Sequence, residues 1–149
     1  MTPAPLLDIS SIRLDASARN RDDAIRQAGM LLVAAGCVGP AYVEGMLARE
    51  ATFSTYLGAG IALPHGRFED RQDVRRSGIS FLQFRAGIRW DEAETAHIVI
   101  GLASLEEEHL DVLANLAALL EDAALVKKLA ETGDKAWVVE RLTLPPSNS

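Results

Sequence analysis

The sequence has a single cysteine, few aromatic residues and no long apolar run. Cys37 has no second thiol, which excludes an internal disulfide, a thiolate zinc cage and a Cys-x-x-Cys redox pair and favours a reducing, cytoplasmic setting. The longest strongly apolar stretch, residues 30–35, is far shorter than the roughly 20 residues of a membrane-spanning helix. The first eight residues lack the basic head and apolar run of a signal peptide. We therefore expect no direct membrane insertion.

Basic residues are also scarce, because 15 lysines and arginines stand against 21 acidic residues, for a net charge of −6. This balance argues against the broad basic surface that binds nucleic acid or an anionic membrane. A chain of 149 residues that is 48% hydrophobic is long enough for one well-packed core. No linker, repeat or low-complexity segment divides it, so residues 1–149 are expected to form a single domain.

The apolar periodicity predicts a mixed α/β order. A helix is expected over residues 20–36, with Asn20 as its N-cap, and a second from Pro40 to about Glu50. Residues 61–63 suit a short strand or a loop. Strands are expected over residues 80–85 and 97–103, the second buried on both faces, and further helices over residues 104–120, 123–130 and 134–142. This order predicts a three-layer sandwich, in which helices flank a small mixed β-sheet.

His65 lies in the segment Gly58-Ala-Gly-Ile-Ala-Leu-Pro-His-Gly66, among residues with little side-chain bulk. Pro64 restricts the backbone before the histidine and Gly66 frees it afterwards, so the imidazole can be presented at a surface with room for an anion or a protein. A neutral imidazole is nucleophilic near pH 7 and can accept a phosphoryl group without a separate general base. The alternative is a turn histidine that only hydrogen-bonds a backbone carbonyl.

Two further side chains, His109 and Arg49, are candidates for such a site, and the third histidine is not. His109 lies on the apolar face of a predicted helix, where it would either help to bind an anion at the helix start or remain a satisfied core-edge histidine. Arg49, at a helix end, could bind two phosphate oxygens or remain solvated. His97 is expected to be a strand-end residue without a chemical role. The histidines lack the spacing of zinc ligands and no nucleotide-binding motif is present, so neither a metal nor a cofactor is expected.

Several segments together resemble one bacterial family. They are Arg49-Glu50, Thr55-Tyr-Leu-Gly58, Ile61-Ala-Leu-Pro-His-Gly66 and Glu108-His-Leu110, supported by residues 77–84 and 98–103. This set resembles the enzyme IIA domain, of the mannitol and fructose type, of the phosphoenolpyruvate-dependent sugar phosphotransferase system. It is most similar to the mannitol branch. The resemblance runs from about residue 5 to about residue 142, and its most specific part is the Pro-His-Gly segment in its extended context.

The resemblance implies a phosphotransferase component with the IIA fold. In this family the histidine at the position of His65 accepts a phosphoryl group from the phosphocarrier protein HPr and passes it to a cysteine of a sugar-specific IIB or IIBC component. The residues at the positions of His109 and Arg49 stabilise that group and its transition state. The negative charge of the chain would then speed its encounter with a phosphocarrier that has a basic docking face.

The chain departs from the mannitol branch at Ala59 and Gly60, where that branch has glutamate and serine. These departures leave the sugar open but do not affect the histidine chemistry. A second interpretation is a regulatory protein of the nitrogen-related IIA type, whose histidine phosphorylation gates binding to other proteins. A third is a ligand-binding or structural domain that forms no phosphohistidine. The similarity of residues 55–58 and 100–103 to the mannitol branch favours sugar uptake.

Overall fold

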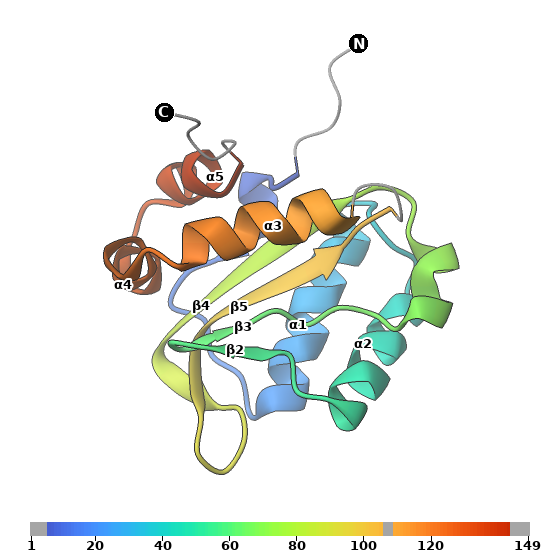
Figure 1. The fold of residues 1–149 in the computed structure, drawn as a ribbon, viewed down its shortest axis with the longest axis horizontal. Helices are drawn as coiled ribbons and strands as arrows, with labels where there is room; N and C mark the ends of the chain where they lie inside the picture. The colour runs from blue at the N-terminus through green and yellow to red at the C-terminus, as the bar shows by residue number, and fades with distance from the viewer. Residues whose placement is uncertain (1–5, 106–108, 144–149) are drawn as a thin grey trace.

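A five-stranded mixed β-sheet forms the centre of the fold (Figure 1). The structure is a computed structural model that describes residues 6–105 and 109–143, and for residues 109–113 and 115 it describes the backbone alone. The strands are β1 (Ile12–Arg13), β2 (Tyr56–Gly58), β3 (Ile61–Ala62), β4 (Gly78–Arg89) and β5 (Thr95–Ala103), in the order β1-β4-β5-β3-β2. β1 is parallel to β4 and β3 is parallel to β5, whereas β4–β5 and β2–β3 are antiparallel pairs.

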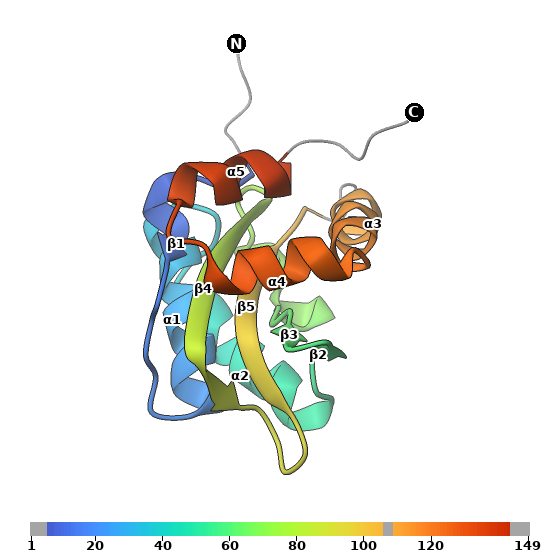
Figure 2. The ribbon, with the colours of Figure 1, turned by 90° about the vertical axis from the view of Figure 1, so that its left-hand side faces the viewer.

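Helices cover both faces of this sheet, as Figures 1 and 2 show. α1 (Arg21–Ala34) and α2 (Ala41–Thr52) pack on one face, and α3 (His109–Leu120), α4 (Ala123–Glu131) and α5 (Lys135–Thr143) pack on the other. Alternate residues of β5 enter the two cores: Val99 faces α1 and α2, whereas Ile98 and Ile100 face α3 to α5. The predicted three-layer sandwich is therefore confirmed. None of the helices within the described ranges has the length and apolarity needed to cross a bilayer.

The helix predictions agree with the structure to within a few residues. The side chain of Asn20 accepts a hydrogen bond from the backbone N–H of Asp23 at 2.8 Å and caps α1 as expected. Asp122 caps α4 in the same way. The predicted helix over residues 104–120 corresponds to α3 from His109 onward, whereas Ser104 and Leu105 are not helical and residues 106–108 lie outside the described residues.

The strand predictions were less complete. β5 was anticipated, and its buried residues do face both cores. β4 begins two residues earlier and ends four residues later than residues 80–85, because its second half continues past an irregularity between Gln83 and Ile88. The edge strands β1 and β2 were not predicted, since two or three residues are too few to show a period of two. Two 3₁₀ helices, η1 (Ile9–Ser11) and η2 (Phe68–Asp73), were also missed.

We expect Gly101→Ala to destabilise the fold, because α1 packs directly on β5 at this position. A methyl group there would lie 2.5 Å from the Ser80 hydroxyl, which donates a hydrogen bond to the carbonyl of Ala28 at 2.8 Å. Displacing that hydroxyl should lower the free energy of unfolding by about 1 to 3 kcal/mol, measured by urea denaturation. Gly133→Ala is the control, because only the end of Arg85 lies within 4 Å of its added methyl group. Equal stabilities of the two variants would contradict this account of the packing.

Candidate functional site

The site lies where the parallel strands β3 and β5 end. The carboxyl ends of neighbouring parallel strands meet at one edge of a sheet, which is a common place for ligand sites. After β3 the chain continues along β5: His65 forms a parallel bridge with Leu102, and the backbone N–H of Leu102 donates to the carbonyl of Pro64 at 2.9 Å. Ser104 follows β5 at the same edge. The pairing therefore fixes His65 at the end of the sheet.

The imidazole of His65 is oriented by its own backbone. Its Nδ1 lies 2.9 Å from the carbonyl oxygen of Leu63. A carbonyl oxygen can only accept, so Nδ1 carries the proton in this contact, and the neutral ring then has its lone pair on Nε2. His65 is half-buried. The structure therefore contains the turn histidine bonded to a carbonyl, and the role of the ring as a nucleophile stays a prediction.

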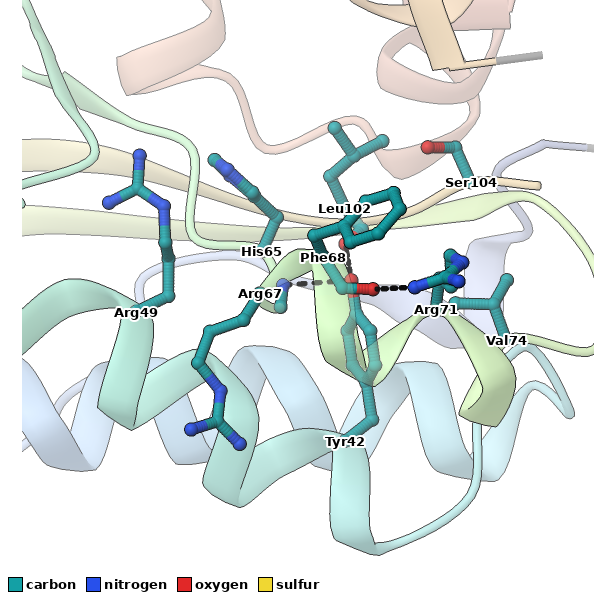
Figure 3. Close-up of a pocket in the computed structure, with 10 residues that line it drawn as sticks. Tyr42, Arg49, His65, Arg67, Phe68, Arg71, Val74, Leu102 and Ser104 are labelled. Carbon is teal, nitrogen blue, oxygen red and sulfur yellow. Dashed lines mark hydrogen bonds between the residues drawn. The ribbon is translucent and has the colours of Figure 1, made fainter. Parts of the chain in front are cut away.

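His65 lines a cavity of about 450 Å³. The other lining residues are Tyr42, Arg49, Gly66, Arg67, Phe68, Arg71, Val74, Leu102 and Ser104 (Figure 3). Three of the described lining residues are arginines and none is a carboxylate, whereas the whole chain has a net charge of −6. The cavity thus combines a half-buried imidazole with guanidinium groups and an apolar wall, an arrangement suited to an anionic group.

Arg49 lies in the last turn of α2, as predicted. One of its terminal nitrogens donates to the carbonyl of Phe53 at 2.7 Å, and its guanidinium lies 5.9 Å from the centre of the Phe53 ring. Because a guanidinium carries five N–H donors, this contact holds the side chain while leaving donors for another group. Figure 3 shows the polar ends of Arg49 and His65 turned the same way. The structure therefore brings these two predicted site residues to one cavity.

Glu50 fixes the end of the helix that carries Arg49. Its carboxylate is buried and accepts hydrogen bonds from the backbone N–H of Thr55 at 2.7 Å, from the Thr55 hydroxyl at 2.5 Å and from the Trp90 indole at 3.0 Å. A buried carboxylate needs such donors to offset the loss of water. These bonds tie the exit of α2 to the segment before β2 and to the turn after β4, so Arg49 is presented by an anchored helix end.

Arg67 lines the cavity but is turned away from His65 (Figure 3). Asp70 accepts from the Arg67 backbone N–H at 2.8 Å and from its guanidinium at 3.0 and 3.2 Å. These hydrogen bonds lower the pKa of the Asp70 carboxyl, the largest contribution coming from the Arg67 side chain. Asp70 in turn packs against Gly45 of α2, where an added methyl group would lie 2.1 Å from a carboxylate oxygen. Sequence reasoning missed this pair, since only the i, i+3 spacing hints at it.

The remaining predicted residues fall elsewhere. α3 begins at His109, but the side chain of His109 lies outside what the structure describes, so its role stays a prediction. His97 lies within β5, is absent from the lining of the cavity and contacts the carbonyl of Phe84 through Nδ1 at 3.1 Å. Among the described side chains, no group of three or more His, Cys, Asp or Glu residues could hold a metal ion.

The segment after His65 corrects one expectation. Gly66 was expected to give the backbone special freedom, but positive φ angles occur at Gly58 and Gly60, not at Gly66. Gly66 is needed for space instead: a methyl group there would lie 2.5 Å from the ring of Tyr42. Tyr42 was itself missed, because the apolar periodicity of α2 drew attention to its other residues.

An oriented imidazole beside guanidinium groups is suited to an anionic group, and comparison with known proteins gives the family of the chain. The profile described as "Phosphoenolpyruvate-dependent sugar phosphotransferase system, EIIA 2" matches residues 5–143, so the chain belongs to this family of phosphotransferase components. The Multiphosphoryl transfer protein of Xanthomonas campestris pv. campestris is 46% identical over 132 residues, which make up 89% of this chain and 16% of that protein. The matched region is only 16% of that protein and 33% of the Multiphosphoryl transfer protein of Salmonella typhimurium, so the chain spans a small part of the length of such relatives.

Solved structures of the family share the fold. The Escherichia coli complex of enzyme IIAMTL and phosphorylated enzyme IIBMTL contains a chain that superimposes with a TM-score of 0.85 at 38% identity, over 92% of this chain and 98% of that one. The Nitrogen Regulatory Protein IIA-Ntr of Neisseria meningitidis superimposes with a TM-score of 0.80 at 29% identity, over 93% and 97% of the two chains. The IIA fold inferred from the sequence is confirmed.

The Asp70 contact predicts a pH-dependent contribution to stability. Because the folded-state pKa of Asp70 is lowered from the ordinary value of 3.8, its contribution is present above that value and is lost as the pH falls through the folded-state pKa. We expect Asp70→Asn to be less stable than wild type at pH 7, and the difference to shrink in acid. Urea denaturation between pH 7 and pH 2.5 measures it. Glu69→Gln, at a more exposed carboxylate 3.8 Å from Arg67, is the control. A difference that stays constant with pH would contradict the charge-based explanation.

Proposed function

We propose that this chain is a cytoplasmic phosphocarrier of sugar uptake. Nε2 of His65 accepts a phosphoryl group from phosphorylated HPr and passes it to a cysteine of a sugar-specific IIB or IIBC component. The observation that carries the proposal is the 2.9 Å contact between His65 Nδ1 and the Leu63 carbonyl at the rim of the arginine-lined cavity. This contact leaves Nε2 as the nucleophilic nitrogen.

Both transfers are displacements at phosphorus. In the first, the lone pair of Nε2 forms the new N–P bond while the N–P bond of the donor phosphohistidine breaks. In the second, a cysteine thiolate of the IIB component forms an S–P bond while the N–P bond to His65 breaks, and the electron pair returns to Nε2. The transition state is loose and carries negative charge on three oxygens, so catalysis depends on alignment and on donors.

Residues at and beside the cavity meet these two requirements. Arg49 offers charge-assisted donors to the phosphoryl oxygens, and His109 is proposed as a second donor from the start of α3. Leu63 sets the ring orientation through its carbonyl. The apolar wall formed by Phe68 and Leu102 limits the access of water to the phosphohistidine.

Exposed aromatic side chains beside the site support transient docking of protein partners. Phe53, next to Arg49, and Phe68, on the cavity wall, each have 71% of their surface exposed. Large exposed apolar residues around a reactive group are typical of an interaction surface. The charge argument made from the sequence needs revision, because the lining of the site is basic although the chain is acidic. The guanidinium groups are suited to bind the anionic phosphoryl group, whereas they would repel a basic docking face.

The two residues that differ from the mannitol branch lie away from His65 and its cavity. Ala59 and Gly60 form the turn between β2 and β3, at the opposite end of β3 from His65, and neither lines the cavity. This placement supports the interpretation that they leave phosphoryl transfer intact. A mannitol-like sugar remains the proposed substrate class of the pathway that the chain serves.

A second candidate function is regulation through the phosphorylation state of His65. The structural similarity to IIA-Ntr of Neisseria meningitidis favours it, although the identity of 29% is lower than the 38% shared with enzyme IIAMTL. Incubating the phosphorylated chain with a candidate IIB component separates the two functions. Onward transfer of the label supports sugar uptake, and a phosphorylated chain that discharges to no IIB component supports regulation.

We expect His65→Ala to abolish phosphoryl acceptance. Purified enzyme I, HPr and labelled phosphoenolpyruvate should produce an acid-labile, base-stable label that maps to His65 in the wild-type chain. His97→Ala is the matched control, because it removes the imidazole that lies outside the cavity. Labelling of His65→Ala at the wild-type level would refute the proposed carrier.

We expect Arg49→Ala to slow the transfer without abolishing it, because the nucleophile remains while donors to the transition state are lost. The single-turnover rate constant should fall by about 100-fold, as for the loss of one transition-state donor in other enzymes. His109→Ala should have an effect in the same direction. Arg75→Ala, at an exposed arginine outside the lining of the cavity, is the control. Equal rates for Arg49→Ala and Arg75→Ala would remove Arg49 from the mechanism.

A further inference from the structure

Tyr42 and Arg49 reach the same cavity from one helix. They are seven residues apart in α2, about two turns or roughly 10 Å along the axis, and therefore lie on the same face of the helix. Unlike Arg49, Tyr42 is almost completely enclosed, with 4% of its surface exposed. A partner protein therefore cannot make substantial contact with it, and any effect of Tyr42 on the site must pass through the residues around it.

The phenol oxygen of Tyr42 joins the two chain segments that meet at the site. It accepts a hydrogen bond from the backbone N–H of Gly66 at 2.8 Å and donates one to the carbonyl of Leu102 at 2.9 Å. On the other side of the histidine, the carbonyl of Pro64 accepts from the N–H of Leu102. Both neighbours of His65 are thus tied to Leu102: Pro64 directly, and Gly66 through the phenol, whose hydrogen bonds are drawn in Figure 3.

Tyr42 is also in tight van der Waals contact with Gly66. The ring of Tyr42 packs so tightly against Gly66 that a methyl group on that residue would lie 2.5 Å from a ring carbon. Burial raises the pKa of Tyr42 to about 12, so the phenol keeps its proton, and its bond to Leu102, at any ordinary pH. The arrangement is present in the structure without a ligand.

We infer that Tyr42 is a positioning residue, which holds the backbone on both sides of His65 so that Nδ1 stays bonded to Leu63 and Nε2 points into the cavity. The inference rests on the proposed function, because it assigns Tyr42 a part in the same phosphoryl transfer. It also has a consequence for the donors at the site. The Gly66 N–H is engaged by the phenol and is not an open donor for the phosphoryl oxygens, whereas Arg49 retains donors for them.

The first test compares Tyr42→Phe with Tyr56→Phe. Tyr56 is a matched control, because its hydroxyl also accepts from a glycine N–H, that of Gly60 at 2.9 Å, and donates to a carbonyl, that of Thr95 at 3.2 Å, but outside the cavity. We expect Tyr42→Phe to lower the single-turnover rate constant by about 10- to 100-fold, the effect of a small misalignment. The KM for phosphorylated HPr should stay unchanged, and Tyr56→Phe should transfer at the wild-type rate.

The second test needs no phosphorylation. The ¹⁵N chemical shifts of the His65 ring report which nitrogen carries the proton, and in the wild-type chain they should show the proton on Nδ1. In Tyr42→Phe we expect a mixture of tautomers, because a looser backbone weakens the contact with Leu63. Tyr56→Phe should give the wild-type shifts. Gly66→Ala provides a second variant should Tyr42→Phe fold poorly, since its methyl group displaces the phenol from the other side.

The outcomes separate the two proposals. A folded Tyr42→Phe with wild-type ring shifts and a wild-type transfer rate would overturn the positioning role. A lower rate combined with altered ring shifts supports it, whereas an equal loss of rate in Tyr56→Phe would show a general effect of stability and overturn it. Failure of the wild-type chain to accept a phosphoryl group would refute the proposed function, while the ring shifts would still show whether Tyr42 orients His65.

Discussion

The site depends on the parallel pairing of the segment after β3 with β5. This pairing continues beyond the two residues of β3 itself, through the bond between Pro64 and Leu102, and ends at His65. Because β5 is buried on both faces, its position is fixed by the two cores of the protein. The pairing with β5 thereby fixes the backbone of His65 at the edge of the sheet.

The second element of the site is one face of α2. Three positions on that face, two turns in all, each meet a different part of the site: Tyr42 contacts Gly66, Gly45 contacts Asp70, and Arg49 lines the cavity. The middle position has to be glycine because the carboxylate of Asp70 occupies the space of a side chain. α2 alone therefore positions three parts of the site: the backbone beside His65, the 3₁₀ helix η2 and the guanidinium of Arg49. Shifting this helix would disturb all three together.

Much of the fold could be predicted because its long elements carry strong signals. The cap Asn20 and the apolar run of β5 mark elements that the structure contains. The short strands β1 and β2 exist because neighbouring strands offer them partners, and that information is not local. The position of His65 and Arg49 in one cavity followed from resemblance, not from spacing. Tyr42 could not be found in this way, because its role depends on a contact with a residue 24 positions away.

The lining of the cavity and the whole chain carry opposite signs of charge. Three arginines line the cavity, and Arg67 is paired with Asp70, whereas the chain has a net charge of −6. An approaching anionic group is therefore attracted to the arginines at the cavity more than to the rest of the acidic chain. Under the proposed function, a phosphoryl group on His65 would offset part of that local positive charge and weaken the attraction. Charge alone would then distinguish the unphosphorylated chain from the phosphorylated one before any side chains touch.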